Sequence, residues 1–358
     1  MSGLIRAVID NNALQHNLSV VRARAGNARV MAVVKANAYG HGLVPTALAL
    51  EAADAFGVAR LEEGVALRRG GVTRPILLLE GVFGAEQLEE AARERLDLVV
   101  HDVSQIELLE RRGGAGRFVL WVKIDTGMNR LGFPLGEFAA ALERLRALSP
   151  PPRELRLLTH LACANERDDA VTKAQLACFR EARRGLPYAV SIANSAGLFG
   201  AVALGCDWVR PGIALYGVSP FDDCGAADLG LRPVMRLESS VIAVRRVPRG
   251  QSVGYGGAWV ASRDSTIAII AAGYGDGLHR SLSGGAPVLI DGRRASVAGR
   301  VSMDMMAVDV TELGGVRIGT RALLWGPGLP VEEVARHART IPYELLCAVS
   351  ERVPLVVS

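Results

Sequence analysis

The feature that most constrains the fold is an eightfold alternation of apolar and amphipathic segments between residues 30 and about 215. Between the apolar runs lie segments such as AEQLEEAARERL and VSQIELLERR, whose apolar residues recur every three or four positions, as in amphipathic helices. Continuous apolar strands separated by helices favour a parallel barrel of the (β/α)8 type, although an open doubly wound sheet fits the same alternation. The apolar runs, rich in Val, Ile and Leu, are residues 30–36, 54–59, 74–80, 96–100, 117–125, 155–161, 188–194 and 207–212.

Polar or reactive side chains stand at the ends of at least five of these runs. The carboxyl ends of barrel strands meet at one mouth, where barrel enzymes build their sites. We therefore expect these side chains to converge, although each one alone could be an ordinary polar residue at a strand end. They are Lys35, Asp125 with Arg130, His160, Asn194 with Ser195, and Arg210.

The sequence changes character after about residue 228. Short β-type runs such as STIAIIAAGYGDG and TRALLWG are separated by Gly, Pro, Asp and Ser turns, and helical period returns only at VEEVARHA. A Gly, Asp and Ser stretch at 219–230 suits a linker. We predict a barrel domain over residues 1–228 and a mostly β domain over residues 229–358.

Composition argues against several other classes of protein. The 358 residues carry 41 basic and 37 acidic side chains, and the arginines are scattered, unlike those of a nucleic-acid surface. No apolar run approaches the roughly 20 residues of a membrane span, and the first residues lack a secretory pattern. The five cysteines are widely spaced without a CxxC pair, which indicates reduced thiols and no metal site. We therefore expect a soluble, cytoplasmic protein that binds neither nucleic acid nor membrane.

The stretch KANAYGHG at residues 35–42 places Lys35 at the end of an apolar run. A lysine that is partly desolvated there can form a Schiff base, whereas a lysine that reaches solvent is the plainer interpretation. The stretch closely resembles the pyridoxal 5'-phosphate signature of the alanine racemases (fold-type III), whose lysine holds the cofactor as an internal aldimine. The resemblance continues in family order at 123–133, 193–197, 209–217, 253–259, 273–277, 299–311 and 341–347. It implies a pyridoxal-phosphate barrel followed by a β domain.

Racemisation requires that a proton leave Cα on one face and return on the other, so two bases are needed. The resemblance assigns Lys35 to the D-enantiomer and Tyr255, from the partner subunit, to the L-enantiomer. A tyrosine is normally protonated, so this use requires surroundings that favour the phenolate. Taken without the resemblance, Tyr255 between glycines would be a turn or strand aromatic.

The resemblance also implies a set of cofactor contacts. Arg210 faces the pyridine nitrogen, which must then accept a hydrogen bond and remain unprotonated, a state that limits transamination. His160 lies between Arg210 and the tyrosine base and tunes that tyrosine. Asn194 also belongs to this set with a less definite role, because Asn and Ser there could equally form a helix N-cap. The phosphate contacts are Tyr39, Ser195, Gly212, Ile213 and Tyr343.

For the substrate, the resemblance implies that Arg130 and the backbone amide of Met303 bind the carboxylate. Lys123 matches a lysine that several relatives carry in carboxylated form, although a pair with Asp125 would look the same in sequence. Two further residues, Tyr274 and Asp304, match the lining of the family's access corridor.

These features predict an alanine racemase that acts as a homodimer with shared active sites and supplies D-alanine for peptidoglycan. A serine or broad-specificity racemase on the same scaffold is the nearest alternative, because corridor residues set side-chain tolerance. A pyridoxal-phosphate carrier without activity would be a single barrel, and a fold-related decarboxylase would lack KANAYGHG. Two departures from the family pattern, Asn165 and the missing acidic residue before Ile9, affect only packing and corridor shape.

Overall fold

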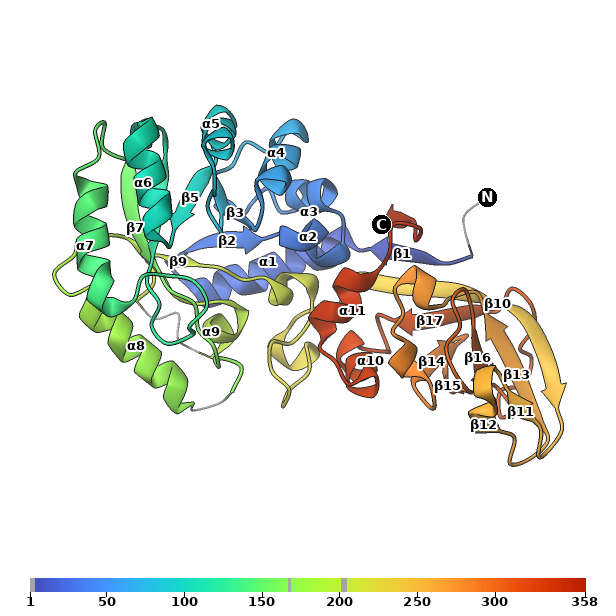
Figure 1. Cartoon of the computed structure of the whole chain (residues 1–358). Helices are drawn as coiled ribbons and strands as arrows, with labels where there is room; N and C mark the ends of the chain where they lie inside the picture. Colours follow the sequence, from blue (N-terminus) through green and yellow to red (C-terminus); the bar gives the residue numbers. More distant parts are fainter. Residues whose placement is uncertain (1–3, 167–168, 201–204) are drawn as a thin grey trace.

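The computed structural model describes residues 4–166, 169–200 and 205–358, with a barrel at one end and a β domain at the other (Figure 1). The parallel barrel is confirmed, because eight strands pair in chain order and the first pairs with the last, Val30 lying opposite Val209. An open sheet is thereby excluded. The barrel strands are β2 (Arg29–Val33), β3 (Ala55–Val58), β4 (Ile76–Leu78), β5 (Asp97–Val100), β6 (Val119–Lys123), β7 (Glu154–Leu158), β8 (Val190–Ser191) and β9 (Trp208–Val209).

Large side chains fill the interior of the barrel. Trp121 and Trp208 meet edge to face with ring centroids 5.7 Å apart, and Met31, Val99 and Leu158 belong to the same buried cluster. The interior is therefore a packed core and not a pore, as expected for this architecture. Space for a ligand is left at the mouth.

Helices surround the barrel, with buried apolar faces that explain their three- and four-residue periodicity. The first helix has an N-cap, since the Asp10 carboxylate accepts a hydrogen bond from the Ala13 amide at 2.9 Å. The helices are α1 (Asn11–Ala25), α3 (Leu43–Ala49), α4 (Leu61–Arg69), α5 (Ala85–Arg93), α6 (Val103–Arg112), α7 (Leu135–Arg146), α8 (Ala170–Ala182) and α9 (Ser195–Phe199), with 3₁₀ turns η1 (Ala115–Arg117), η2 (Ile213–Tyr216) and η3 (Ala227–Leu229).

The β domain is built around one long strand, β10 (Met235–Val247), which pairs with both β17 and β13 and so makes the sheet curl back on itself. The order across the sheet is β13-β16-β15-β14-β17-β10-β1-β18. The other elements are β13 (Ser265–Ile270), β14 (Pro287–Ile290), β15 (Arg293–Val297), β16 (Met306–Asp309), β17 (Arg321–Trp325), β18 (Leu355–Val357), the hairpin β11 (Ser252–Val253) and β12 (Trp259–Val260), and the turns η4 (Tyr255–Gly257), η5 (Tyr274–Asp276) and η6 (Arg280–Leu282).

The first strand, β1 (Arg6–Ile9), joins the sheet of the β domain and not the barrel. It pairs antiparallel with β10, Ile9 lying opposite Met235, and parallel with β18, Val8 lying opposite Val356. The sequence pattern did not predict this arrangement, because strand partners more than 200 residues away leave no local signal. Strand β1 accordingly lies beside β10 in the β domain (Figure 1).

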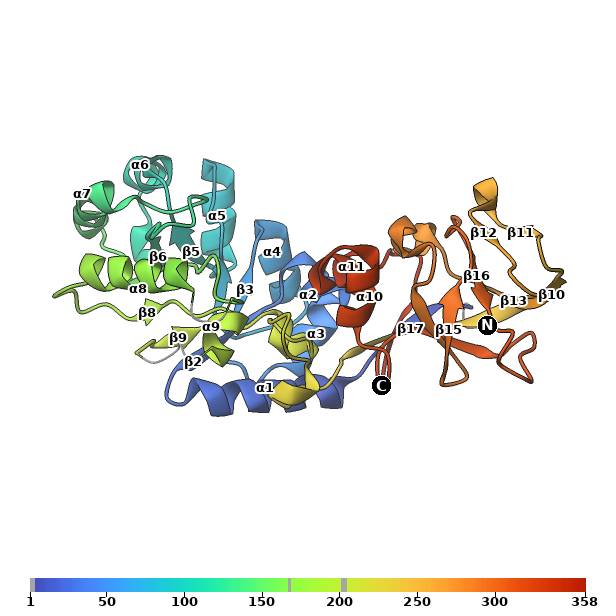
Figure 2. The ribbon, with the colours of Figure 1, turned by 90° about the horizontal axis from the view of Figure 1, so that it is seen from below.

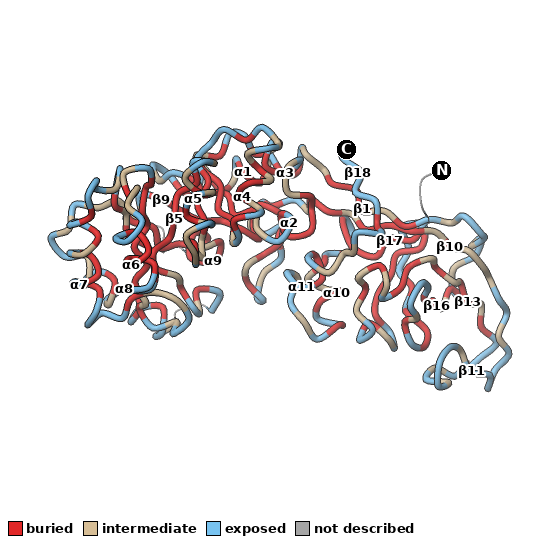
Figure 3. The backbone as a smooth tube through the Cα atoms, turned by 45° about the horizontal axis from the view of Figure 1, so that its top comes forward, coloured by how far each residue is buried: buried red, intermediate tan, exposed pale blue. Residues whose placement is uncertain are grey.

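Two helices, α10 (Val331–Ala338) and α11 (Pro342–Ala348), lie between the barrel and the sheet in both ribbon views (Figures 1 and 2). Burial is concentrated in the barrel strands and the middle of the sheet, whereas the β11–β12 hairpin is largely exposed (Figure 3). Within the described residues, no helix is both long and apolar enough to cross a membrane.

Candidate active site

A cavity of about 1220 Å³ opens at the carboxyl ends of the barrel strands. Its walls come from the barrel, from the 219–228 segment and from α10 and α11. It collects most of the residues that the sequence analysis singled out: Lys35, Tyr39, Lys123, Arg130, His160, Asn194, Ser195, Arg210, Gly212, Ile213 and Tyr343.

Lys35 begins a strained turn, α2 (Lys35–Gly40), directly after β2. The four residues 36–39 are all left-handed, with φ between 53 and 54°, although none is glycine. This conformation costs roughly 1–2 kcal/mol per residue, and it persists only where the surroundings fix it. The Ala38 amide donates to the Val34 carbonyl at 2.9 Å, which closes the turn onto the strand.

His41 follows this turn and has a structural role. Its ring is buried against Tyr216, with centroids 4.6 Å apart, and its Nδ1 donates toward the carbonyls of Ala38 and Tyr39 at 3.1 and 2.9 Å. Burial lowers the pKa of His41 to about 4, so the ring is neutral near pH 7. The residue does not line the cavity described above.

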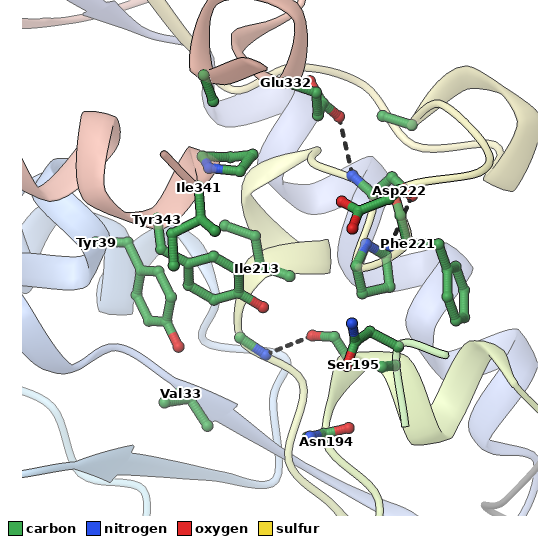
Figure 4. Close-up of a pocket in the computed structure, with 18 of the residues that line it drawn as sticks. Val33, Tyr39, Asn194, Ser195, Ile213, Phe221, Asp222, Glu332, Ile341 and Tyr343 are labelled. Carbon is green, nitrogen blue, oxygen red and sulfur yellow. Dashed lines mark hydrogen bonds between the residues drawn. The ribbon is translucent and has the colours of Figure 1, made fainter. Parts of the chain in front are cut away.

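Hydroxyl and amide groups gather where strands β8 and β9 end. The Gly212 amide donates to Ser195 Oγ at 2.9 Å, and a Cβ at Gly212 would collide with the Tyr39 hydroxyl, so glycine leaves the room that this hydroxyl needs. The Tyr39 and Tyr343 rings lie 5.8 Å apart, and Figure 4 shows both hydroxyls directed toward the space beside Ser195. Burial raises the pKa of Tyr39 above its usual range and that of Tyr343 to about 12, so both hydroxyls carry a proton to donate.

Asn194 lines the cavity and also forms the helix N-cap that the sequence analysis considered for it. Its side-chain oxygen accepts a hydrogen bond from the Gly197 amide at 2.9 Å and so begins α9. The cap orients the neighbouring Ser195 hydroxyl toward the backbone of Gly212.

Arg210 is a buried cation surrounded by neutral acceptors. Its guanidinium donates to Ser191 Oγ at 2.5 Å and to the carbonyls of Thr159 and Ile192 at 2.6 and 3.4 Å. In the part of the chain that the structure describes, no carboxylate forms an ion pair with it. Burial lowers the pKa of Arg210 to about 10, so it remains charged near pH 7. An uncompensated buried charge of this kind favours a ligand that accepts a hydrogen bond.

His160 faces this guanidinium, since Nη2 of Arg210 lies 3.4 Å from Nδ1 of the imidazole. Arginine can only donate, so Nδ1 accepts and Nε2 carries the hydrogen. Burial, reinforced by the charges of Arg210 and Lys123, lowers the pKa of His160 to about 3. The imidazole is therefore neutral.

Lys123 is buried at the end of β6, and it is not paired with Asp125. Oδ1 of Asp125 accepts backbone hydrogen bonds from Gly127, Met128 and Asn129 at 2.9 to 3.1 Å and so shapes the loop that carries Arg130. Among the described residues no ion pair to Lys123 is found. Burial, with the nearby charges of Arg210 and Arg130, lowers the pKa of Lys123 to about 8.

The cavity is strongly cationic on the barrel side, where Lys35, Lys123, Arg130 and Arg210 all face it. Donors for a phosphate, Lys35 and the buried guanidinium of Arg210, which pairs with no carboxylate among the described residues, stand together there. These residues fit pyridoxal 5'-phosphate, an anionic aldehyde whose ring nitrogen can accept a hydrogen bond. Acidic residues line the cavity as well, including Glu80 after barrel strand β4 and Glu332 on α10, which accepts from the Ser219 amide at 3.0 Å (Figure 4).

Four predicted site residues lie outside this cavity, on the β domain: Tyr255, Tyr274, Met303 and Asp304. Tyr255 belongs to η4 in the β11–β12 hairpin, which lies at the end of the β domain away from the barrel in both views, and 69% of it is exposed (Figures 1 and 2). The Tyr274 amide donates to the Ser302 carbonyl at 3.0 Å, so Tyr274 and Met303 share one surface. One chain therefore brings Lys35 to its cavity but not Tyr255.

Several residues that support the site could not be identified from the sequence. Ser191 and Thr159 supply the acceptors for Arg210, and Tyr216 stacks on Tyr39 with centroids 4.7 Å apart. Glu63 accepts a hydrogen bond from the Ala36 amide at 2.6 Å. The only sequence signal for any of these residues was the position of Glu63 in the first turn of a predicted helix. The hydrogen bonds and ring contacts themselves form only when the barrel closes.

Together the closed barrel, the cationic cavity at its mouth and the lysine in a strained turn define an enzyme of the barrel class with its site at the carboxyl ends of the strands. Two family descriptions match this chain: "Alanine racemase, N-terminal domain" over residues 9–220 and "Alanine racemase, C-terminal domain" over residues 234–357. The chain belongs to the alanine racemase family, and it is an isomerase of the amino-acid racemase type.

Individual relatives agree over the full length. Alanine racemase from Shewanella baltica (strain OS195) is 48% identical over 355 residues, 99% of each chain. The biosynthetic alanine racemase from Pseudomonas aeruginosa superposes with a TM-score of 0.96 at 44% identity, and all of each chain is covered. The alanine racemase from Bartonella henselae, solved with covalently bound pyridoxal phosphate, gives a TM-score of 0.88 at 32% identity over 99% of this chain and all of that one.

Proposed function

We propose that the protein interconverts L-alanine and D-alanine with pyridoxal 5'-phosphate as its cofactor. The observation that carries the proposal is the convergence of Lys35, the phosphate donors and the uncompensated Arg210 in one cavity. The Bartonella henselae relative, which contains covalently bound pyridoxal phosphate, supports the choice of cofactor.

Each group of cavity residues then has a task. Lys35 would hold the cofactor covalently, and the guanidinium of Arg210 would donate a hydrogen bond to its ring nitrogen. When bound, the cofactor withdraws electrons from the amino acid and so makes its Cα proton acidic. Tyr39, Ser195, Gly212, Ile213 and Tyr343 would donate to the phosphate, and Asn194 would orient these donors.

Two bases move the Cα proton. Lys35 takes it from the D-enantiomer on one face, and Tyr255 of the partner subunit takes it from the L-enantiomer on the opposite face. The homodimer is essential to this proposal, because the β11–β12 hairpin that carries Tyr255 lies at the end of the β domain away from the barrel (Figure 1). His160, whose imidazole is neutral, connects Arg210 with that tyrosine and tunes its proton affinity.

The remaining residues bind and select the substrate. Arg130 and the backbone amide of Met303 of the partner subunit hold its carboxylate, and the partner's Tyr274 and the partner's Asp304 line the access corridor. Carboxylation of Lys123 would steady Arg130, and the absence of an ion pair at Lys123 within the described residues supports this assignment. The biological role is the supply of D-alanine for peptidoglycan in the cytoplasm. The boundary between the two domains falls at 228/229, with β1 added to the sheet of the β domain.

Incubation with each enantiomer in deuterated water tests the proposal directly. Wild type is expected to form the opposite enantiomer from L- and D-alanine and to incorporate deuterium at Cα. Lys35→Ala should lose both reactions, whereas Tyr255→Phe should lose interconversion, by roughly 10²- to 10⁴-fold, the usual contribution of an acid–base group. Full two-way racemisation by Tyr255→Phe would rule out the two-base assignment.

Substrate breadth is tested in the same assay. Serine and longer amino acids are included as substrates, because corridor residues set the side-chain tolerance. Rates with serine close to those with alanine would favour the broad-specificity alternative.

A further inference from the structure

The carboxylate of Glu63 links the turn of Lys35 to the neighbouring strand and helix. Its Oε1 accepts from the Ala36 amide at 2.6 Å, directly after Lys35 in the chain. Its Oε2 accepts from the amides of Ala59 and Arg60 at 2.9 and 3.1 Å, where β3 ends and α4 begins. One side chain therefore joins the lysine turn to the next βα unit of the barrel.

The contact at the Ala36 amide lies at the first residue of the left-handed turn. Residues 36–39 are held in the left-handed region, a conformation that non-glycine residues leave unless neighbours fix it. Before Lys35, the Val34 amide donates to the Gly57 carbonyl at 2.9 Å, so the strand side is anchored by the barrel. After Lys35, the bond from Ala36 to Glu63 is the first contact, and it is assisted by the charge of the carboxylate.

We infer that Glu63 is a positioning residue for Lys35, because it fixes the first left-handed residue of the turn and so aims the lysine amine into the cavity. The inference rests on the proposed function in that Lys35 is taken as the base for the D-enantiomer. Glu63 does not line the cavity, so it acts through Lys35 and not on the substrate.

A rival explanation is that Glu63 only stabilises the start of α4. The two explanations differ in which oxygen matters, since Oε2 serves α4 and Oε1 serves Ala36. Loss of a helix-terminal contact lowers stability without a preference for one enantiomer. Loss of lysine positioning affects the face of the substrate that Lys35 serves.

The first test uses cofactor-free protein and needs no activity. Hydrogen–deuterium exchange is followed in a peptide containing Ala36 for wild type, Glu63→Ala and Glu62→Ala. Glu62 is the matched control, an exposed carboxylate in the same helical turn. Glu63→Ala is expected to speed exchange there roughly tenfold or more by opening the turn locally, whereas Glu62→Ala should leave it unchanged. Unchanged exchange in Glu63→Ala would overturn the inference.

The second test uses the enzyme loaded with cofactor. Deuterium wash-in at Cα without inversion is measured separately for D-alanine and L-alanine in Glu63→Gln, which offers only one acceptor oxygen for three amides. Wash-in into D-alanine is expected to fall roughly ten- to a hundredfold, because small misplacements of a catalytic group are costly, and to fall much less for L-alanine.

The outcomes separate the two ideas. Equal slowing for both enantiomers, or a lower unfolding temperature with unchanged wash-in, would assign Glu63 to α4 alone and overturn the inference. If wild type itself fails to exchange either enantiomer, the proposed function fails, and the exchange rate at Ala36 still decides whether Glu63 holds the turn.

Discussion

Gly40 packs directly against the backbone carbonyl of Leu346, so the turn that carries Lys35 touches helix α11 with no space for a side chain. The φ of Gly40 is 80°, in the left-handed region that favours glycine. Helix α11 also carries Tyr343 into the cavity. The position of one cavity tyrosine is thus fixed by contact with the lysine turn.

Gly40→Ala is therefore expected to destabilise the protein by about 2–4 kcal/mol, since left-handed strain and a backbone collision add. The variant should also bind cofactor less tightly, because α11 must move and displace Tyr343. Chemical unfolding and a cofactor titration measure the two effects.

Gly71→Ala provides the matched control for this prediction. Gly71 has a φ of 90°, but a Cβ there would meet nothing within 4 Å. Only the backbone strain remains, about 1 kcal/mol. Equal losses in the two variants would show that contact with Leu346 contributes nothing.

Much of this architecture could be predicted from the sequence because its signals are local. A parallel strand that is buried on both faces appears in the sequence as a continuous apolar run. Closure of the barrel then brings together the residues that follow the strands, such as Lys35, His160 and Arg210. Strands β8 and β9 contain only two residues each, yet a continuous apolar run in the sequence includes each of them.

The rest depended on partners far away in the chain. The composition of the 219–230 stretch predicts a linker, yet part of it lines the cavity, and its Ser219 amide donates to Glu332, 113 residues away. The left-handed turn at 36–39 was equally hidden, because alanine and tyrosine do not favour that conformation and tertiary contacts impose it.

Lys123 is expected to react with carbon dioxide, because burial lowers its pKa to about 8 and a neutral amine is the nucleophile. Protein equilibrated with ¹³C-bicarbonate should show a carbamate signal by NMR that grows as the pH rises toward 8. Lys123→Ala should lack the signal, and Lys173→Ala serves as a control on a surface helix. A wild-type spectrum without this signal would leave Lys123 as an unmodified amine.

The carboxyl group of Asp97 makes the free energy of unfolding depend on pH. Burial raises its pKa from 3.8 to about 6, so between these values the folded state keeps a proton that the unfolded state has released. Stability from this group is therefore present near pH 4 and is lost as the pH rises through 6. Asp97→Asn does not titrate, and it should be more stable than wild type near pH 7 by about 2–3 kcal/mol, a gain that vanishes near pH 4.

Unfolding in urea from pH 4 to pH 8 measures this difference. Asp102→Asn is a control in which the change of stability with pH has the opposite sign, because hydrogen bonds from Ser104 lower the pKa of Asp102. The stability that this carboxylate contributes is present at neutral pH and is lost as the pH falls. A constant difference between Asp97→Asn and wild type across the range would contradict the assignment.

The sharing of active sites between subunits is tested by mixing two inactive variants. If Tyr255 completes the cavity of the other chain, a hybrid of Lys35→Ala and Tyr255→Phe contains one intact site and one doubly defective site. With random exchange of subunits half the dimers are hybrids, so about a quarter of the wild-type activity should return. Equilibration of the mixture followed by racemisation of L-alanine gives the measurement.

A second mixture distinguishes shared sites from sites built by one chain alone. Wild type mixed equally with the double variant Lys35→Ala/Tyr255→Phe forms hybrids in which neither cavity has both bases. About a quarter of the sites should then remain active if sites are shared, against about half if each chain supplies its own tyrosine. Recovery in the first mixture together with a quarter in the second requires that Tyr255 cross the interface. No recovery in the first and half in the second would require the β11–β12 hairpin to reach its own barrel, a movement across the length of the β domain (Figure 1).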